Sequence, residues 1–387
     1  MFNLISALVF PAGSGIRGIV FSSISWIYSW TGSYGLAIIM FTLFLRVAFI
    51  PLDFATKYFT KRNSIRMAEL KPEEERLKNT YADDPMGLQR ARQEMYKKHG
   101  AGMGGFCLFT ILNLVVMMVI FINVFQGLNQ ISHFNVNNQY THLQGVYQEW
   151  RQQGYTREQL AENEYFHAEI NQVFNDTTPS FLWVSNMWRP DAPWTRQALN
   201  WSQFQSAINN VHSDYRVTAL STSQNLESEY NFIFSNIDAS ARRWNGFLLF
   251  VLLAGATTYF SVVLNAKMMK ARDKEKKENE EKEAGYSIRD ALVETPAGTK
   301  APISPMDPAM MGKMMKFMMP VIMIIFTLTN TAALAIYITM SSLFATLIGL
   351  GLNKLVELII KKQESKKKEK QPDMTIINPH AKYFKNK

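Results

Sequence analysis

The chain has 387 residues, of which 47% are hydrophobic and only 19% are charged, and its formal net charge is +9. Its one cysteine, Cys107, excludes a framework of intrachain disulfides, so any domain outside a membrane must be held by packing. Long uncharged stretches alternate with dense runs of Lys and Glu. This segregation is typical of a polytopic membrane protein.

Five stretches are apolar enough to cross a bilayer, since a spanning helix needs about 20 mostly apolar residues. They are 34–52, 106–126, 245–265, 313–330 and 332–352. The last two are divided by the polar sequence TLTNT. We therefore expect an all-α polytopic membrane protein with five core transmembrane helices, whose ends lie on opposite sides of the membrane.

The distribution of lysine predicts the orientation. Every lysine lies in 57–98, 267–316 or 354–387, and Lys and Arg are enriched in cytoplasmic flanks. The N-terminus is therefore expected outside and the C-terminus in the cytoplasm. The segments outside the spans are then an external N-terminal segment (1–33), a cytoplasmic hairpin (53–105), an external domain (127–244), a charged cytoplasmic loop (266–312) and a basic cytoplasmic tail (353–387).

Three of these segments carry further signals. In 16–30, Ser22, Ser25 and Ser29 share one helical face and Ile, Val and Trp crowd another, which predicts an interfacial helix or an ordinary packed one. In the hairpin, Asp84 and Pro85 mark the start of a second amphipathic helix. The hairpin is either a solvated pair of helices or a docking arm for a partner or substrate. The basic tail suits anionic lipid or ribosomal RNA, and equally a solvated topology anchor.

A single charge, Arg46, lies inside the first span. At 1.5 Å per residue it is about 10 Å from Asp53 at the cytoplasmic end. Burying it in lipid costs about 3 kcal/mol on insertion scales. No Asp or Glu occurs in any predicted span, so an ion pair is excluded there. Snorkelling to the nearer, cytoplasmic side would oppose the lean of helical side chains toward the helix N-terminus. We therefore expect a hydrophilic groove open to the cytoplasm.

Four polar side chains are expected to share this groove with Arg46. Thr42 lies one turn away on the same helix face. Asn113, Thr257 and Thr258 lie about 7 or 8 residues from the inner ends of their spans, at a similar depth. Other polar residues fall nearer the outside and are expected to join helices: Thr327, Asn330, Thr339 and Ser341.

The six histidines all lie outside the predicted spans, so a Ser-His or zinc site within the membrane is not expected. We predict no enzymatic activity, no cofactor and no metal. A secondary transporter is one alternative, but it would need intramembrane carboxylates or repeated broken helices. A scaffold for membrane-protein assembly is the other.

Several stretches occur in an order that resembles the YidC-type membrane protein insertases. They are TGSYGLAIIMFTLFLRVAFIPL (31–52), the hairpin RMAELKPEEERLKNTYADDPMGLQRARQEMYKKHG (66–100), FLWVSNMWRPD (181–191), LLAGATTYFS (252–261) and MKFMMPVIMIIFTLTNTAALAIY (315–337). The resemblance implies a membrane insertase and chaperone of a bacterial plasma membrane, or inner membrane. It implies that Arg46 serves the groove, that the hairpin captures substrate and that the tail contacts the ribosome.

The resemblance also implies partners: nascent membrane proteins, membrane lipids, the Sec translocon, the ribosome and the signal recognition particle pathway. The chain departs from the family pattern at several positions. Gly102 and Met103 stand where the family has Asn-Pro, and Asn113 stands where it has a glutamine. The stretch 192–245 is longer than the family leads us to expect, so an insertion of unknown role is predicted there.

Overall fold

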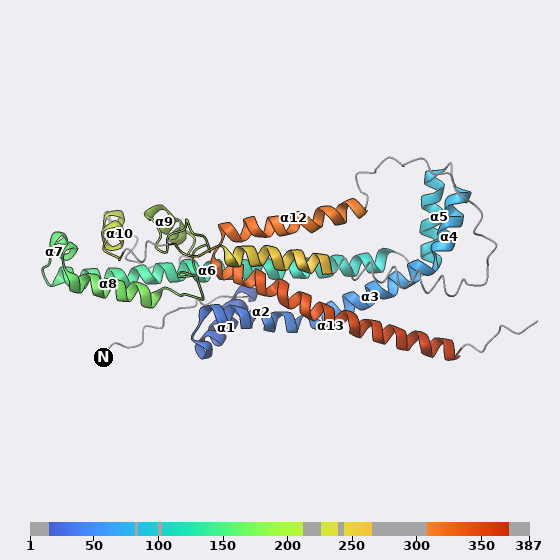
Figure 1. Cartoon of the computed structure of the whole chain (residues 1–387), viewed down its shortest axis with the longest axis horizontal. Coiled ribbons are helices and arrows are strands. Elements are labelled where there is room, and N and C mark those ends of the chain that lie inside the picture. The colour runs from blue at the N-terminus through green and yellow to red at the C-terminus, as the bar shows by residue number, and fades with distance from the viewer. Residues whose placement is uncertain are drawn as a thin grey trace, which may run out of the picture. The chain divides into compact units, whose positions relative to one another are not determined.

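The computed structural model describes residues 15–81, 84–99, 103–211, 226–238, 244–264 and 308–370. Most of the predicted charged loop 266–312 and the end of the basic tail lie outside these residues. The described residues are predominantly helical and contain two isolated β-bridges but no strand (Figure 1). Contacts divide the chain into two units: Met1–Arg46 with Val119–Ala345, and Val47–Met118 with Thr346–Lys387.

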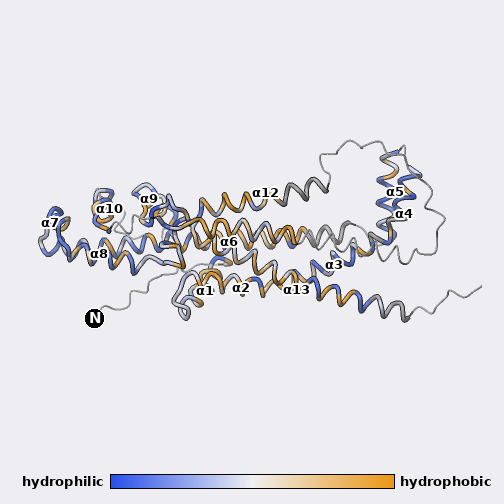
Figure 2. The backbone as a smooth tube through the Cα atoms, viewed as in Figure 1, coloured by the Kyte–Doolittle hydropathy of each residue, from blue (hydrophilic) through white to orange (hydrophobic). Residues whose placement is uncertain are grey.

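The first unit holds most of the helices. They are α1 (Gly15–Thr31), α2 (Tyr34–Ala48), the later part of α6 (Met103–Gln152), α7 (Arg157–Ala161), α8 (Glu164–Thr177), α9 (Trp201–Asn209), α10 (Leu226–Ser235), the Leu249–Leu264 helix, α12 (Pro308–Thr329) and the start of α13 (Ala332–Lys370). Apolar residues concentrate in the middle of α6, in α12 and in the first half of α13 (Figure 2).

Two described helices are long and apolar enough to cross a membrane, Ile111–Gln152 and Ala332–Gln363. A third is obtained if α2 and α3 (Ile50–Glu69) form one bent span. Shorter apolar helices lie at the places expected for the third and fourth spans, Leu249–Leu264 and Phe317–Thr329. The first predicted span is not one continuous helix. It breaks at Phe49 because Pro51 lacks an N–H and its ring opposes the carbonyl of Val47.

Within the first unit, α12 contacts both α6 and the Leu249–Leu264 helix. Phe326 of α12 packs on Phe121 and Phe125 of α6, with ring centroids 5.9 and 5.4 Å apart. A Cβ built on Gly255 would lie 2.6 Å from Ile324, so the Leu249–Leu264 helix lies very close to α12. These contacts place small and aromatic residues where the helix backbones approach.

Beyond the predicted end of the second span, α6 continues without a break to Gln152 and forms the central helix of the segment predicted to be the external domain. Helix α8 runs back along it (Figure 1), and the Gln139 amide of α6 donates a hydrogen bond of 2.8 Å to the Thr178 hydroxyl at the end of α8. Tyr140 of α6 packs on Phe204 of α9 and Tyr230 of α10. The helices of this segment are therefore held together by aromatic packing on one long helix.

The FLWVSNMWRPD stretch connects this domain to the Leu249–Leu264 helix. The fully buried carboxylate of Asp191 accepts hydrogen bonds from the backbone N–H groups of Phe247, Leu248 and Phe250 at 2.9, 3.2 and 2.7 Å, and from Trp183 Nε1 at 3.2 Å. An acid at a helix N-terminus satisfies N–H groups that have no partner within the helix. Asp191 thereby fixes where this helix begins.

In the second unit, α4 (Lys71–Thr80) packs on α5 (Pro85–Lys98). The Asp84 side chain accepts a hydrogen bond of 2.9 Å from Gly87 N, which confirms the predicted helix start. Leu70 and Met95 form a small core, and Glu74 pairs with Arg92 at 3.1 Å. The first helix of the hairpin is predicted to be continuous, but it is interrupted at Leu70. Helix α4 begins at the next residue, Lys71, which is followed by a proline.

Candidate functional site

Arg46 lies near the end of α2, where its side chain is half-buried. Its Nη2 donates a hydrogen bond to the hydroxyl of Ser341 on α13, and Ser341 is only 8% exposed. Tyr337, one turn before Ser341 on α13, is also buried. The rest of α2 is largely apolar. A hydroxyl group of a different helix supplies the polar contact of this charge.

Among the residues that the structure describes, Arg46 forms no ion pair with a carboxylate. A guanidinium carries five N–H donors, and the hydrogen bond to Ser341 uses one of them. A serine hydroxyl does not neutralise the charge. The positive charge is therefore available to interact with water or with an anionic group that approaches it.

Ser342, the next residue of α13, extends the polar cluster to a third helix. Its hydroxyl lies 3.4 Å from the hydroxyl of Thr258 on the Leu249–Leu264 helix. Thr339 Oγ1 donates to the Phe250 carbonyl at 3.4 Å, close to the start of the same helix. Consecutive residues of α13 thus reach α2 on one side and the Leu249–Leu264 helix on the other.

The other predicted groove residues occupy different surroundings. Thr42 is fully buried, and its hydroxyl donates to the Ile38 carbonyl of its own helix at 2.7 Å. The Thr257 hydroxyl also bonds within its helix, to Leu253 O at 2.8 Å. Asn113 belongs to the second unit, where its Oδ1 is buried and has no hydrogen-bond partner among the described residues.

Sequence reasoning placed Ser341 nearer the outside and did not pair it with Arg46. The structure shows that Ser341 does join two helices, but that Arg46 is its partner. By residue count, Ser341 lies about 7.5 Å further from the predicted inner end of its span than Arg46 does from the inner end of its own. The long Arg46 side chain covers this difference because helical side chains lean toward the N-terminus, which is the predicted outer side. The polar Ser-Ser pair at 341–342 inside an apolar run was the available signal.

The apolar helices, with an arginine in one of them that pairs with no carboxylate of the described residues, define a helical membrane protein. The sequence matches the model of the family described as "60Kd inner membrane protein" over residues 26–362, and the chain belongs to this family.

Several curated relatives carry the name "Membrane protein insertase YidC". The chain is 32% identical to the one from Wolinella succinogenes over 105 residues, which cover 26% of this chain and 18% of the relative. It is 32% identical to that of Clostridium tetani over 103 residues, 26% of this chain and 44% of the relative. It is 38% identical to that of Brucella suis over 79 residues, 20% and 12% respectively. The matches therefore span less than half of each of these relatives.

Proposed function

We propose that this protein is a membrane protein insertase and chaperone. In this proposal, a groove takes up the polar segment of a substrate while the substrate's apolar helix passes into the bilayer. The observation that carries the proposal is the half-buried Arg46, bonded to Ser341 and paired with no carboxylate of the described residues. Similarity to proteins named membrane protein insertase YidC supports it.

The chemistry is electrostatic and involves no covalent step. Two unit charges 4 Å apart attract by about 4 kcal/mol at an effective dielectric constant of 20, against about 1 kcal/mol in water. Arg46 therefore attracts the polar or acidic end of a substrate more strongly than a surface arginine would. The apolar helix of the substrate then leaves for lipid, because burial of its apolar surface is favourable.

The proposed groove is lined by Arg46, Thr42, Asn113, Thr257 and Thr258, with the newly identified hydroxyl groups of α13 beside them. Thr258 already contacts Ser342, which supports a polar path across α13. The buried and unpartnered Oδ1 of Asn113 is a costly group in an apolar helix, since such a group typically destabilises a fold by about 1–3 kcal/mol. Water or a substrate amide would satisfy it. These features support a hydrated interior around five core spans.

Exposed apolar side chains provide a route for the substrate helix. Leu252 on the Leu249–Leu264 helix is 56% exposed, and Leu343 on α13 is 39% exposed. We propose that such side chains of the third and fifth spans guide the incoming helix into lipid.

The α4–α5 hairpin is the proposed capture arm. It is a compact element with its own small core and ion pairs, and Met86 at the start of α5 is 68% exposed. Methionine adapts to apolar partners of varied shape. We propose that the hairpin receives nascent membrane proteins from the ribosome or the signal recognition particle pathway, and that the protein also works beside the Sec translocon.

The proposed location is the bacterial plasma membrane, with the N-terminus outside and the C-terminus in the cytoplasm. Segregation of all lysines to three segments supports this orientation. An impermeant amine reagent on intact cells should leave the lysine side chains unlabelled. Strong labelling within 57–98 would contradict the topology.

Insertion by proteoliposomes that hold only this protein tests the function. The substrate is a single-span protein with an acidic N-terminal tail. We expect Arg46→Ala to lose most insertion while remaining folded in the membrane, and Arg46→Lys to keep much of it because the charge persists. Full insertion by Arg46→Ala for every substrate would contradict the proposal. Uptake of a small solute without insertion would favour a transporter.

A further inference from the structure

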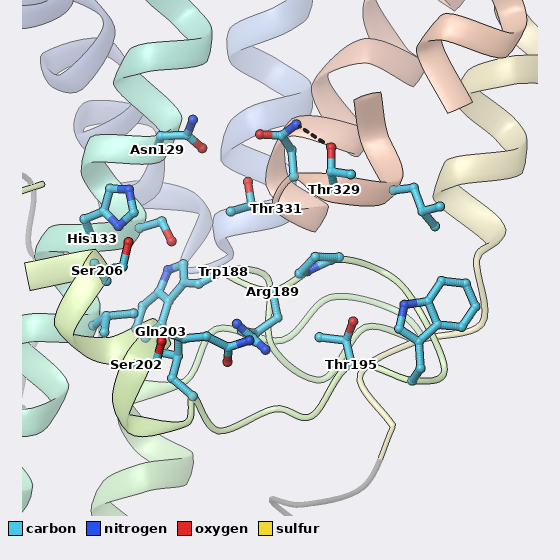
Figure 3. A pocket seen from close by; sticks show the side chains of 18 residues that line it. Asn129, His133, Trp188, Arg189, Thr195, Ser202, Gln203, Ser206, Thr329 and Thr331 are labelled. Carbon is cyan, nitrogen blue, oxygen red and sulfur yellow. Dashed lines mark hydrogen bonds between the residues drawn. The ribbon is translucent and has the colours of Figure 1, made fainter. Parts of the chain in front are cut away.

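A second polar site lies on the outer side of the first unit, away from Arg46. It is a cavity of about 620 Å³ lined by the outer part of α6, by α9, by the loop that holds Trp188 and Arg189, and by the end of α12 (Figure 3). Asn129, Thr329 and Thr331 lie along one side, and Ser202, Gln203 and Arg189 along the other (Figure 3).

The lining is rich in hydrogen-bond donors and has no carboxylate. None of the residues that line this cavity is Asp or Glu, although the segment 127–244 as a whole has seven arginines and eleven acidic residues. Arg189 is half-buried and makes no ion pair among the residues that the structure describes; its Nε donates to the Arg196 carbonyl at 3.0 Å. Burial lowers the pKa of Arg189, as expected for a cation without a counter-charge.

Two buried polar atoms of the lining have no hydrogen-bond partner among the described residues. Trp188 is 4% exposed, and its Nε1 has no hydrogen-bond acceptor among the described residues. The Thr331 hydroxyl, which also lines the cavity, is likewise buried without a partner among those residues. Native proteins rarely leave such groups unsatisfied, so an acceptor from outside the chain is indicated.

The position of the cavity suggests what that acceptor is. Asn129 follows the predicted outer end of the second span by three residues, or about 4.5 Å. Thr331 lies at the junction of the last two predicted spans. Both therefore fall at the level of the lipid headgroups, which extend about 5–7 Å beyond each face of the hydrocarbon. Trp194, 66% exposed in the same lining, suits that level.

A smaller cavity of about 320 Å³ shares Asn129 and His133 with the first and adds a second cation, Arg17 of α1. No acidic residue lines it either. The two cavities are therefore neighbours that share part of their lining. Arg189 lines the larger one and Arg17 the smaller one.

We propose that the larger cavity binds the phosphate of a phospholipid headgroup from the outer leaflet, with Trp188 Nε1 and the Arg189 guanidinium as its principal donors. Phosphate oxygens accept several hydrogen bonds, and arginine binds them with defined geometry. This site is independent of the proposed insertase function.

Native mass spectrometry of the full chain in detergent tests this proposal. Short-chain phosphatidylglycerol is titrated beside a diacylglycerol with the same acyl chains, which lacks the phosphate. Wild type should retain phosphatidylglycerol and not diacylglycerol. Trp188→Phe should weaken retention about tenfold, the loss expected for one hydrogen bond to a charged group. Because Trp188 belongs to the buried core, the smaller ring should also lower the melting temperature, so Ser206→Phe on the exposed face of α9 provides the independent test.

Ser206→Phe offers a second variant, since it fills the cavity from the exposed face of α9 and should also weaken retention. Gln205→Phe, on the same helix but outside the lining, is its matched control and should retain the lipid. Equal retention of diacylglycerol, or unchanged affinity in both Trp188→Phe and Ser206→Phe, would overturn the proposal. Displacement of the lipid by equimolar inorganic phosphate would assign the site to a free anion. Displacement by an acidic peptide would assign it to a polypeptide segment, and either result would overturn the lipid proposal.

Discussion

Arg46 and Ser341 are 295 positions apart in the chain, and a hydrogen bond joins them across α2 and α13. The neighbouring Ser342 faces Thr258 on the Leu249–Leu264 helix. Helix α13 thus provides polar contacts to two other helices from adjacent residues. It organises the polar part of an otherwise apolar bundle.

Ser341→Ala should weaken insertion less than Arg46→Ala does, because the charge remains when its hydroxyl partner is lost. Hydrogen bonds between membrane helices contribute about 0.6 kcal/mol on average, so the melting temperature should change little. The double variant should insert no worse than Arg46→Ala alone. The insertion assay measures all three, and Ser29→Ala on the exposed face of α1 serves as the control. Additive losses in the double variant would show that the two residues act separately.

Asp191→Ala should destabilise the protein by about 2–4 kcal/mol, because a helix cap is lost and several buried N–H groups lose their acceptor. The carboxylate of Asp191 accepts hydrogen bonds from the backbone N–H groups of Phe247, Leu248 and Phe250 and from the indole N–H of Trp183. Thermal unfolding in detergent measures the effect.

Asp176→Ala is the matched control for this prediction, since Asp176 is exposed at the end of α8. It should unfold like wild type. If Asp191→Ala were equally stable, the cap would not define the start of the Leu249–Leu264 helix.

Gly35→Ala should destabilise the protein by about 1–3 kcal/mol through overpacking. A Cβ at this position of α2 would collide with the ring of Phe181. A Cβ on Gly145 of α6 would have nothing within 4 Å, so Gly145→Ala should stabilise by up to about 1 kcal/mol through helix propensity. Opposite signs of the two shifts in unfolding temperature are expected. A stabilised Gly35→Ala would show that α2 is not packed against Phe181.

Acid should destabilise the protein through His133 of α6. Burial lowers the pKa of His133 below its ordinary value of 6.5. The unfolded chain then binds more protons than the folded one below that value, so stability falls as the pH falls from about 6.5 toward the folded pKa. His133→Gln should remove this part of the loss. Unfolding temperatures of both proteins at pH 7.5 and 5.5 measure it, and an identical acid response in the two would contradict the prediction.

Much of the helical organisation follows from local chemistry. Asp84 before Pro85 predicted the start of α5, and its side chain caps that helix. The apolar runs predicted the helices that the structure shows at those places. The break at Phe49 follows from Pro51, but the apolar pattern continues through it and so predicted one unbroken helix.

Contacts between segments far apart in the chain were harder to predict. Asp191 caps a helix that begins nearly 60 residues later, and no local pattern indicates such a partner. The number of residues from the end of each span indicates the depth of a backbone position in the membrane. It does not include the length of the Arg46 side chain, which reaches Ser341 at a different depth. The presence of Arg46 and the absence of Asp and Glu from the predicted spans could be read from the sequence. Its hydroxyl partner, Ser341, could be found only from the structure.

Access of water to position 46 from the cytoplasm tests the central claim most directly. Cys107→Ser removes the one native cysteine, and Arg46→Cys or Phe44→Cys is then introduced into that background. Phe44 is a matched apolar, exposed position on the same helix. An impermeant thiol reagent is applied to either face of membrane vesicles. The account predicts that Arg46→Cys reacts from the cytoplasmic face and that Phe44→Cys does not. Failure of Arg46→Cys to react, or reaction only from the outer face, would contradict it.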